Sequence, residues 1–161
     1  MSDDAEFGKE WQRPDPALLA MRRSVTVWVG GGLGLVGAGV VAAREGWVPG
    51  LAALGLAGGL TNLTLRAVER RCAAWGYLER EDDLMVRRGV LVRRTSLVPY
   101  GRMQYVDVTA GPLQRRYGLA TVTMHTAAAA TDAYVPGLRA DEAARLRDRL
   151  AALGEARQAG V

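Results

Sequence analysis

Three glycines, Gly32, Gly34 and Gly37, form the pattern G-x-G-x-x-G, which in dinucleotide-binding proteins lets the backbone approach a pyrophosphate. That chemistry also needs a second strand after the helix and an acidic side chain about 20 residues past the loop, which binds the ribose. Here no run of β-branched residues follows, and no acidic residue lies between Glu45 and Glu69. The context of a cofactor loop is missing, which leaves a nucleotide-dependent oxidoreductase as a remote alternative.

The other residue types that carry out chemistry occur singly. Cys72 is the only cysteine and His125 the only histidine, so neither an intrachain disulfide nor a histidine-pair metal site is possible. His125 lies in TVTMHT, a run that predicts a strand, and shares one face of it with Thr121 and Thr123. This pattern favours a structural strand residue over a catalytic base. A Ser-His-Asp or a Cys-His arrangement is still open from the residue counts, but we expect no catalytic residue, no metal and no cofactor, and a protein that is not an enzyme.

Two stretches, residues 24–43 and 46–65, contain no charged side chain. About 20 helical residues span the roughly 30 Å hydrocarbon core of a bilayer. Glycine costs about 1 kcal/mol in a water-exposed helix, but an unpaired peptide group in lipid costs several times more, so a helix is still expected. The sequence predicts membrane-spanning helices at 24–43 and 47–65. A signal peptide is not favoured, since a second apolar stretch follows at once.

Small residues recur four positions apart in both stretches. Gly30 and Gly34 form one pair, and Gly55 and Gly59 form another. Small residues at this spacing let membrane helices approach closely, so all four are predicted helix-packing residues. An antiparallel hairpin needs only one such face on each helix. We therefore expect self-association, or association with another membrane protein of the same type. Asn62, with Thr61 and Thr64, is expected to hydrogen-bond between helices, and a transport role for Asn62 is the alternative.

Arginines flank the two spans and set the expected orientation. The loop between the spans has only Arg44, whereas the flanking arginines are Arg13, Arg22, Arg23, Arg66, Arg70, Arg71 and Arg80. The positive-inside rule then predicts a multi-pass protein of the plasma (inner) membrane with both termini in the cytoplasm. Arg66, Arg70 and Arg71 directly follow the second span, where contact with lipid phosphates would anchor the chain.

Residues beyond the spans change to short β-like runs separated by turn signals such as Arg88-Gly89; the runs are WGYLER, DLMVRRG, VLVRRTSLVPY, MQYVDVTA, LATVTMHTA and AYVPG. Residues 112–118 predict one or two helical turns, opened by Pro112 and closed by Gly118. Six or seven short strands followed by one helix favour a small barrel or a curved sheet. Trp75 and Tyr77 are predicted to face the core from the first strand, with an aromatic ligand shelf as the alternative. The final element is a predicted helix from Asp141 to Leu153, which Asp141 can cap and Gly154 can end. The expected organisation has four parts: an N-terminal cytoplasmic segment that is partly disordered (1–23), a transmembrane hairpin (24–65), a cytoplasmic domain (66–155) and a tail (156–161).

The region 86–127 resembles the core of the pleckstrin-homology-like (PH-like) domain in bacterial YdbS-like membrane proteins. The matching motifs are Arg88-Gly89, Val98-Pro99-Tyr100, Arg102-Met103-Gln104, Gly111-Pro112-Leu113 and Gly118-Leu119-Ala120. The resemblance covers about residues 24–153. It implies an α+β membrane protein in which a two-helix transmembrane hairpin precedes a small PH-like β-barrel of about seven strands, capped by a C-terminal α-helix. The group has no catalytic motif to carry over.

Eukaryotic PH domains often bind phosphoinositides through basic residues near the first hairpin loop, but the corresponding loop here, residues 80–83, is mostly acidic. Arg87, Arg88, Arg93 and Arg94 lie around the next turn instead and are candidates for contact with anionic headgroups. The alternative is a solvated hairpin whose arginines protect a sheet edge from aggregation.

Together these observations favour a membrane-anchored module that acts as a non-enzymatic scaffold or protein-interaction domain at the inner leaflet. The alternative is an anionic-lipid-binding or envelope-stress factor. Membrane lipids and another membrane protein are the expected partners, and nucleic acid is not expected, since the net charge of +4 is spread without a dense basic patch.

Overall fold

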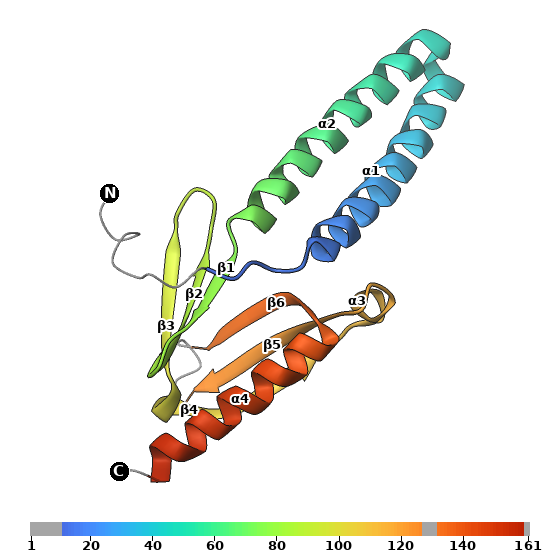
Figure 1. The fold of residues 1–161 in the computed structure, drawn as a ribbon. Coiled ribbons are helices and arrows are strands. Elements are labelled where there is room, and N and C mark those ends of the chain that lie inside the picture. Colours follow the sequence, from blue (N-terminus) through green and yellow to red (C-terminus); the bar gives the residue numbers. More distant parts are fainter. Residues whose placement is uncertain (1–10, 127–131, 160–161) are drawn as a thin grey trace. The chain divides into compact units, whose positions relative to one another are not determined.

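The computed structural model describes residues 11–126 and 132–159 (Figure 1). The chain divides into two compact units, one formed by Met1–Leu18 with Ala73–Val161 and the other by Leu19–Cys72. The second unit contains most of a helical hairpin. The first contains six strands and the C-terminal helix, and its described N-terminal part begins at Trp11.

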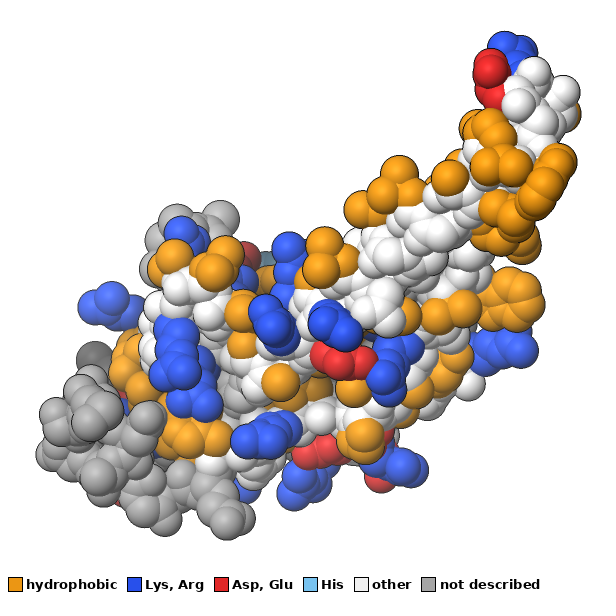
Figure 2. Space-filling model, turned by 90° about the horizontal axis from the view of Figure 1, so that it is seen from above, with side chains coloured by type: hydrophobic (Ala, Val, Ile, Leu, Met, Phe, Trp, Pro, Cys, Tyr) orange, Lys and Arg blue, Asp and Glu red, His pale blue; other side chains and the backbone are white. Residues whose placement is uncertain are grey.

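The hairpin consists of α1 (Pro16–Glu45) and α2 (Trp47–Ala73), which run antiparallel (Figure 1). Both helices are long and apolar enough to cross a membrane. Hydrophobic side chains project along their length, and charged side chains stand at the end where the helices join (Figure 2). Gly46 alone separates the helices and has φ +99°, a left-handed conformation that glycine adopts without strain.

Both helices extend beyond the predicted spans of 24–43 and 47–65. The start of α1 has a clear local cause, because the Asp15 side chain accepts a 2.7 Å hydrogen bond from the Ala17 N–H and Pro16 occupies the first helical position. An aspartate cap followed by proline is a standard helix start, since proline's missing N–H would be unpaired there in any case. Residues 16–23 of the predicted N-terminal segment are therefore helical.

Six antiparallel strands form two sheets of three. Sheet A is ordered β1-β2-β3 and sheet B β4-β5-β6. The bounds are β1 Gly76–Glu79, β2 Asp83–Arg88, β3 Arg94–Pro99, β4 Met103–Thr109, β5 Leu119–Thr126 and β6 Ala133–Arg139. The helical turn η1 (Tyr100–Arg102) joins the two sheets, and α3 (Pro112–Arg116) joins β4 to β5.

The expected closed barrel of about seven strands is wrong for the part of the chain that is described. No strand of sheet A pairs with a strand of sheet B there, and six strands are present. The residues themselves had predicted six or seven short strands in a small barrel or curved sheet, and the resemblance had implied about seven. Pro99 ends β3, and η1 then redirects the chain, so that β4 starts a new sheet instead of extending the first.

The core lies between the inner faces of the two sheets and α4 (Ala140–Ala159). Strand β5 contributes Ala120, Val122 and Met124, which alternate with partly exposed residues as expected for one buried face. Helix α4 contributes one helical stripe, consisting of Ala143, Leu146 and Leu150.

Helix α4 differs from the predicted helix of residues 141–153 at both ends. It starts at Ala140 and continues through Gly154 to Ala159, so Gly154 does not end it. Gly154 is buried, and a Cβ placed on it would lie 3.7 Å from the Tyr100 carbonyl oxygen. This is ordinary van der Waals contact, so packing against η1 buries position 154 without requiring glycine there. Asp141 lies in the first turn, where hydrogen bonds from its own N–H and that of Glu142 lower its pKa.

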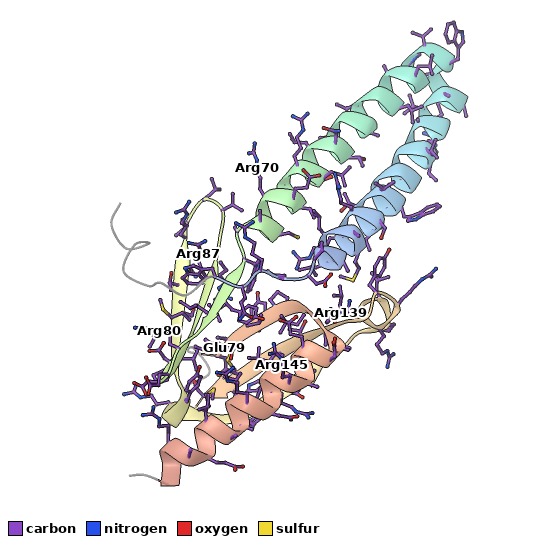
Figure 3. The ribbon with its side chains drawn as sticks, viewed as in Figure 1. Arg70, Glu79, Arg80, Arg87, Arg139 and Arg145 are labelled. Atoms are coloured by element: carbon purple, nitrogen blue, oxygen red, sulfur yellow. The ribbon has the colours of Figure 1, made fainter. Side chains whose placement is uncertain are left out.

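Two polar contacts fasten sheet A to α4. The Tyr77 hydroxyl donates a 2.9 Å hydrogen bond to Glu142, and Glu79 pairs with Arg149 at 3.2 Å. Figure 3 shows Glu79 between β1 and α4. Burial raises the pKa of Tyr77, and its hydrogen bond to Glu142 raises it further, so this hydroxyl keeps its proton and remains a donor.

The segment before α1 is fastened to both sheets. Gln12 exchanges two 2.9 Å backbone hydrogen bonds with Tyr77, and the Asp15 N–H donates to the Gly137 carbonyl at 2.8 Å. Leu18 is 1% exposed and packs on Gly137. Residues 11–15, which were included in a partly disordered segment, are therefore tied to strands, while residues 1–10 of that segment lie outside the described residues.

Candidate functional site

The glycines of the G-x-G-x-x-G pattern all lie inside helix α1. A Cβ on Gly34 would lie 2.8 Å from the Cβ of Ala57, whereas one on Gly32 or Gly37 would meet nothing within 4 Å. No strand precedes these glycines, because the helix already begins at Pro16. The local geometry is thus that of a packed helix and not of a phosphate-binding turn.

The only histidine is a strand residue, as predicted. The Nδ1 of His125 lies 2.9 Å from Asp132, and its ring stacks on Tyr105 with centroids 4.4 Å apart. Asp132 also accepts a 2.9 Å hydrogen bond from the Thr126 N–H, which with His125 lowers the pKa of this carboxyl. These contacts join the end of β5 to the start of β6. No cluster of three or more potential metal ligands occurs among the residues described.

The predicted helix-packing glycines fall into two groups. Gly30 and Gly34 on α1 contact α2, where a Cβ on each would lie 2.7 Å from Thr61 and 2.8 Å from Ala57 respectively. A Cβ on Gly55 or Gly59 would meet nothing within 4 Å. The α2 side of the hairpin contact is therefore formed by Ala57 and Thr61, and packing of Gly55 and Gly59 against another chain stays a prediction.

A groove of about 350 Å³ runs along the same hairpin, lined by residues that include Gly30, Gly34 and Asn62. The expected interhelical bonds do not form here. Thr61 donates instead to the carbonyl of Ala57 on its own helix at 2.8 Å, and Asn62 makes no side-chain hydrogen bond within the described residues.

Arg66, Arg70 and Arg71 are exposed on the last turns of α2. Figure 3 shows Arg70 projecting from this part of the helix. The neighbouring Glu69 pairs with Arg23 of α1 at 2.6 Å. The three predicted anchoring arginines thus lie on the part of α2 beyond the predicted span, which an ion pair joins to α1. Their contact with lipid stays a prediction.

The second set of predicted arginines lies on the β2–β3 hairpin and divides into two pairs. Arg87 and Arg88 are half-buried, with their guanidinium groups 4.7 Å from the ring of Trp11 and 5.4 Å from the ring of Tyr134. Figure 3 places Arg87 at the hairpin. Arg93 and Arg94 are exposed. The first pair therefore holds aromatic rings through cation–π contacts, and the second pair faces solvent.

The turn of this hairpin is apolar. Val90, Leu91 and Val92 are 42%, 99% and 68% exposed. Gly89 has φ +105°, and a side chain on it would collide with the Val92 carbonyl oxygen, so the tight turn requires glycine. We call residues 90–92 the apolar tip.

The acidic β1–β2 loop lies at the other end of sheet A. Asp82 of this loop pairs with Arg157 of α4, and Arg80 lies 3.7 Å from Asp83. The Tyr100 hydroxyl donates to the Arg80 carbonyl at 3.0 Å, and burial raises the pKa of Tyr100 to about 12. These contacts tie the loop to α4 and η1, and the expectation that it does not recognise phosphoinositides stays a prediction.

A family model described as bacterial PH domain matches residues 30–154. The chain belongs to this bacterial PH domain family. It is also 36% identical over 108 residues to the UPF0699 transmembrane protein YdbS of Bacillus subtilis, an alignment that covers 66% of each chain and so just under two thirds of that relative. No solved structure matches the chain. The predicted resemblance is confirmed.

The two apolar helices and the transmembrane relative together support a membrane location for this bacterial PH domain protein. Sequence reasoning found the arginines of the hairpin but missed its apolar tip, because Val90-Leu91-Val92 was assigned to a strand. Arg88-Gly89 was already a turn signal. Strand β3 begins only at Arg94, so the apolar residues after that signal form the turn itself.

Proposed function

We propose that the chain is a membrane-anchored bacterial PH domain that works as a scaffold or protein-interaction module and catalyses no reaction. Its two helices would hold the domain at the inner leaflet, with both termini in the cytoplasm. Its partner would be a second copy, or another membrane protein of the same type.

The observation that carries this proposal is the outward face of α2. Gly55 and Gly59 have open space around them, while the contact with α1 is already made through Ala57 and Thr61. In lipid, helices associate through close backbone approach, and small residues four apart permit it. A second glycine face that the hairpin itself does not use therefore supports association with a further helix.

Co-purification tests the partner directly. Two differently tagged copies of the full chain would be expressed together, solubilised gently and captured through one tag. We expect recovery of the second copy, or of another membrane protein, and loss of that species when Gly55→Leu and Gly59→Leu are combined. Gly37→Leu is the matched control, because a side chain there also meets nothing within 4 Å but lies on α1. Recovery of monomer alone would count against the proposal.

A second candidate function, binding of anionic lipid or a response to envelope stress, is favoured by the exposed guanidinium groups of Arg93 and Arg94. Each arginine near an anionic leaflet contributes about 1 kcal/mol, and salt screens the attraction. Hydrogen exchange of residues 88–94, measured on the full chain in anionic and in zwitterionic nanodiscs, should show salt-sensitive protection only with anionic lipid. Arg93→Gln with Arg94→Gln should remove it, and protection that ignores salt and these changes would exclude this mode.

A further inference from the structure

The apolar tip of the β2–β3 hairpin is unusual for a solvent-exposed turn. Turns of this kind are generally formed by glycine, asparagine, aspartate and other polar residues, because nothing covers their side chains. Here three consecutive apolar side chains are exposed, and Leu91 in the middle is 99% exposed. Contiguous exposed apolar groups of this kind mark interaction sites with proteins or membranes.

The register of sheet A gives the tip a definite position within the fold. Gly76, the first residue of β1, pairs with Arg87, and Arg88 pairs with Arg94 in the last pair before the turn. The turn therefore lies at the end of sheet A where β1 begins. Only Ala74 and Trp75 separate that start from α2. The tip thus lies at the end of the sheet at which the chain arrives from a predicted membrane span.

The chain lengths on the two sides of that junction are similar. From residue 65, the end of the predicted span, to Ala73 the helix rises about 12 Å. Of the residues after Arg87 only Arg88 belongs to β2, and residues 89–93 form the turn, so Leu91 lies at most about 13 Å beyond Arg87. This reach is of the same order as the rise of the helical segment that separates the predicted span from the sheet.

The β2–β3 hairpin is also held in place by its contacts, and it carries positively charged side chains beside the apolar tip. Strands β2 and β3 pair at six consecutive positions, and the rings of Trp11 and Tyr134 contact Arg87 and Arg88 next to the turn. Exposed arginines directly follow the apolar residues. An apolar wedge bordered by arginines matches the layering of a bilayer surface, in which anionic headgroups overlie acyl chains.

We propose that the apolar tip inserts into the interfacial layer of the bilayer that anchors the chain, with Leu91 deepest and Arg93 and Arg94 among anionic headgroups. The bilayer is thus the occupant of this surface. The inference rests on the proposed position of the domain at the inner leaflet. It goes beyond headgroup contact, because burial of apolar side chains persists at a salt concentration that screens the arginines.

A fluorescent reporter tests insertion in the full chain. In a Cys72→Ala background, Leu91→Cys would be labelled with an environment-sensitive dye and the protein placed in nanodiscs that contain lipids with quenchers on the upper acyl chain. Thr95→Cys is the matched control, since it lies on the same hairpin, is exposed and is outside the tip. We expect a blue shift and severalfold stronger quenching at position 91 than at 95, retained at high salt.

Two further outcomes decide the proposal. With the dye at Val90→Cys, Leu91→Asp should abolish quenching and Leu91→Phe should preserve it, and neither change disturbs the core because Leu91 is almost fully exposed. Equal quenching at positions 91 and 95 would overturn the proposal. A blue shift without lipid quenching would also overturn it, by showing that a protein surface covers the tip. Because co-purification through α2 does not involve the tip, failure of either proposal is recognised independently.

Discussion

Replacement of Gly137 by alanine tests how the segment before α1 is fastened to the PH domain. Gly137 has φ +72°, and its carbonyl accepts the Asp15 N–H at 2.8 Å. A Cβ at this position would lie 2.6–2.9 Å from three atoms of the Leu18 side chain. Gly137→Ala therefore imposes a left-handed conformation on a residue with a side chain and also forces that side chain into Leu18.

These two effects have different magnitudes and a matched control separates them. The left-handed conformation costs about 1–2 kcal/mol for a non-glycine residue. Overpacking of a close contact adds about 1–3 kcal/mol. We therefore expect Gly137→Ala to lower the free energy of unfolding by about 2–5 kcal/mol. Gly118→Ala should cost only the first amount, because Gly118 has φ +67° and nothing lies within 4 Å of its added Cβ.

The assay is unfolding of the full chain in detergent micelles, followed by near-ultraviolet circular dichroism of the domain's aromatic residues. Leu18→Ala alone should cost about 2–5 kcal/mol, because the side chain is buried. Combined with Gly137→Ala it should cost less than the sum, since alanine at position 18 removes two of the three colliding atoms, Cγ and Cδ2, and keeps only the Cβ. Equal losses for Gly137→Ala and Gly118→Ala, together with additive costs in the double variant, would refute the contact.

Three other predictions concern separate parts of the molecule. The hydrogen bond from the Thr126 N–H lowers the pKa of Asp132, so this carboxylate stabilises the fold at pH values above its ordinary pKa. The contribution is lost as the pH falls through the lowered pKa. Asp132→Asn should therefore reduce the loss of stability on the acid side, measured as the free energy of unfolding at a series of pH values. Tyr77→Phe removes a hydrogen bond to a carboxylate of α4 without leaving a cavity, and should cost about 1.5–3 kcal/mol in chemical denaturation. Gly34→Val drives a side chain into the facing alanine of α2 and should lower the thermal stability of the hairpin in detergent, whereas Gly37→Val, which meets nothing within 4 Å, should change it little.

Much of the architecture could be read from the sequence, because the decisive signals were long or repeated. Two uncharged stretches of membrane length predicted the helices, and β-like runs with alternating residues predicted the strands. Proline at position 112 and glycine at 118 correctly predicted the short helix between β4 and β5, and Gly118 has the positive φ expected at such an end. Local chemistry determines features of this kind.

The features that were missed depend on tertiary contacts. Gly154 is read as a helix end from sequence alone, but α4 continues through it, and this position is buried against η1 and β4. Which glycines of α2 face α1 was likewise hidden, since pairs such as Ala53 and Ala57 have the same spacing as Gly55 and Gly59. Closure of a barrel depends on pairing between distant strands, which no local pattern reports.

The single residue between α1 and α2 couples the length of the turn to the rotation of α2 about its own axis. Successive residues of a helix are rotated by about 100°, so one residue inserted after Gly46 would turn the whole of α2 by that angle about its axis. Ala57 would leave Gly34, and a bulky neighbour would face the glycine in its place. Any lengthening of this turn during evolution must therefore be accompanied by relocation of the small side chains along the entire second helix.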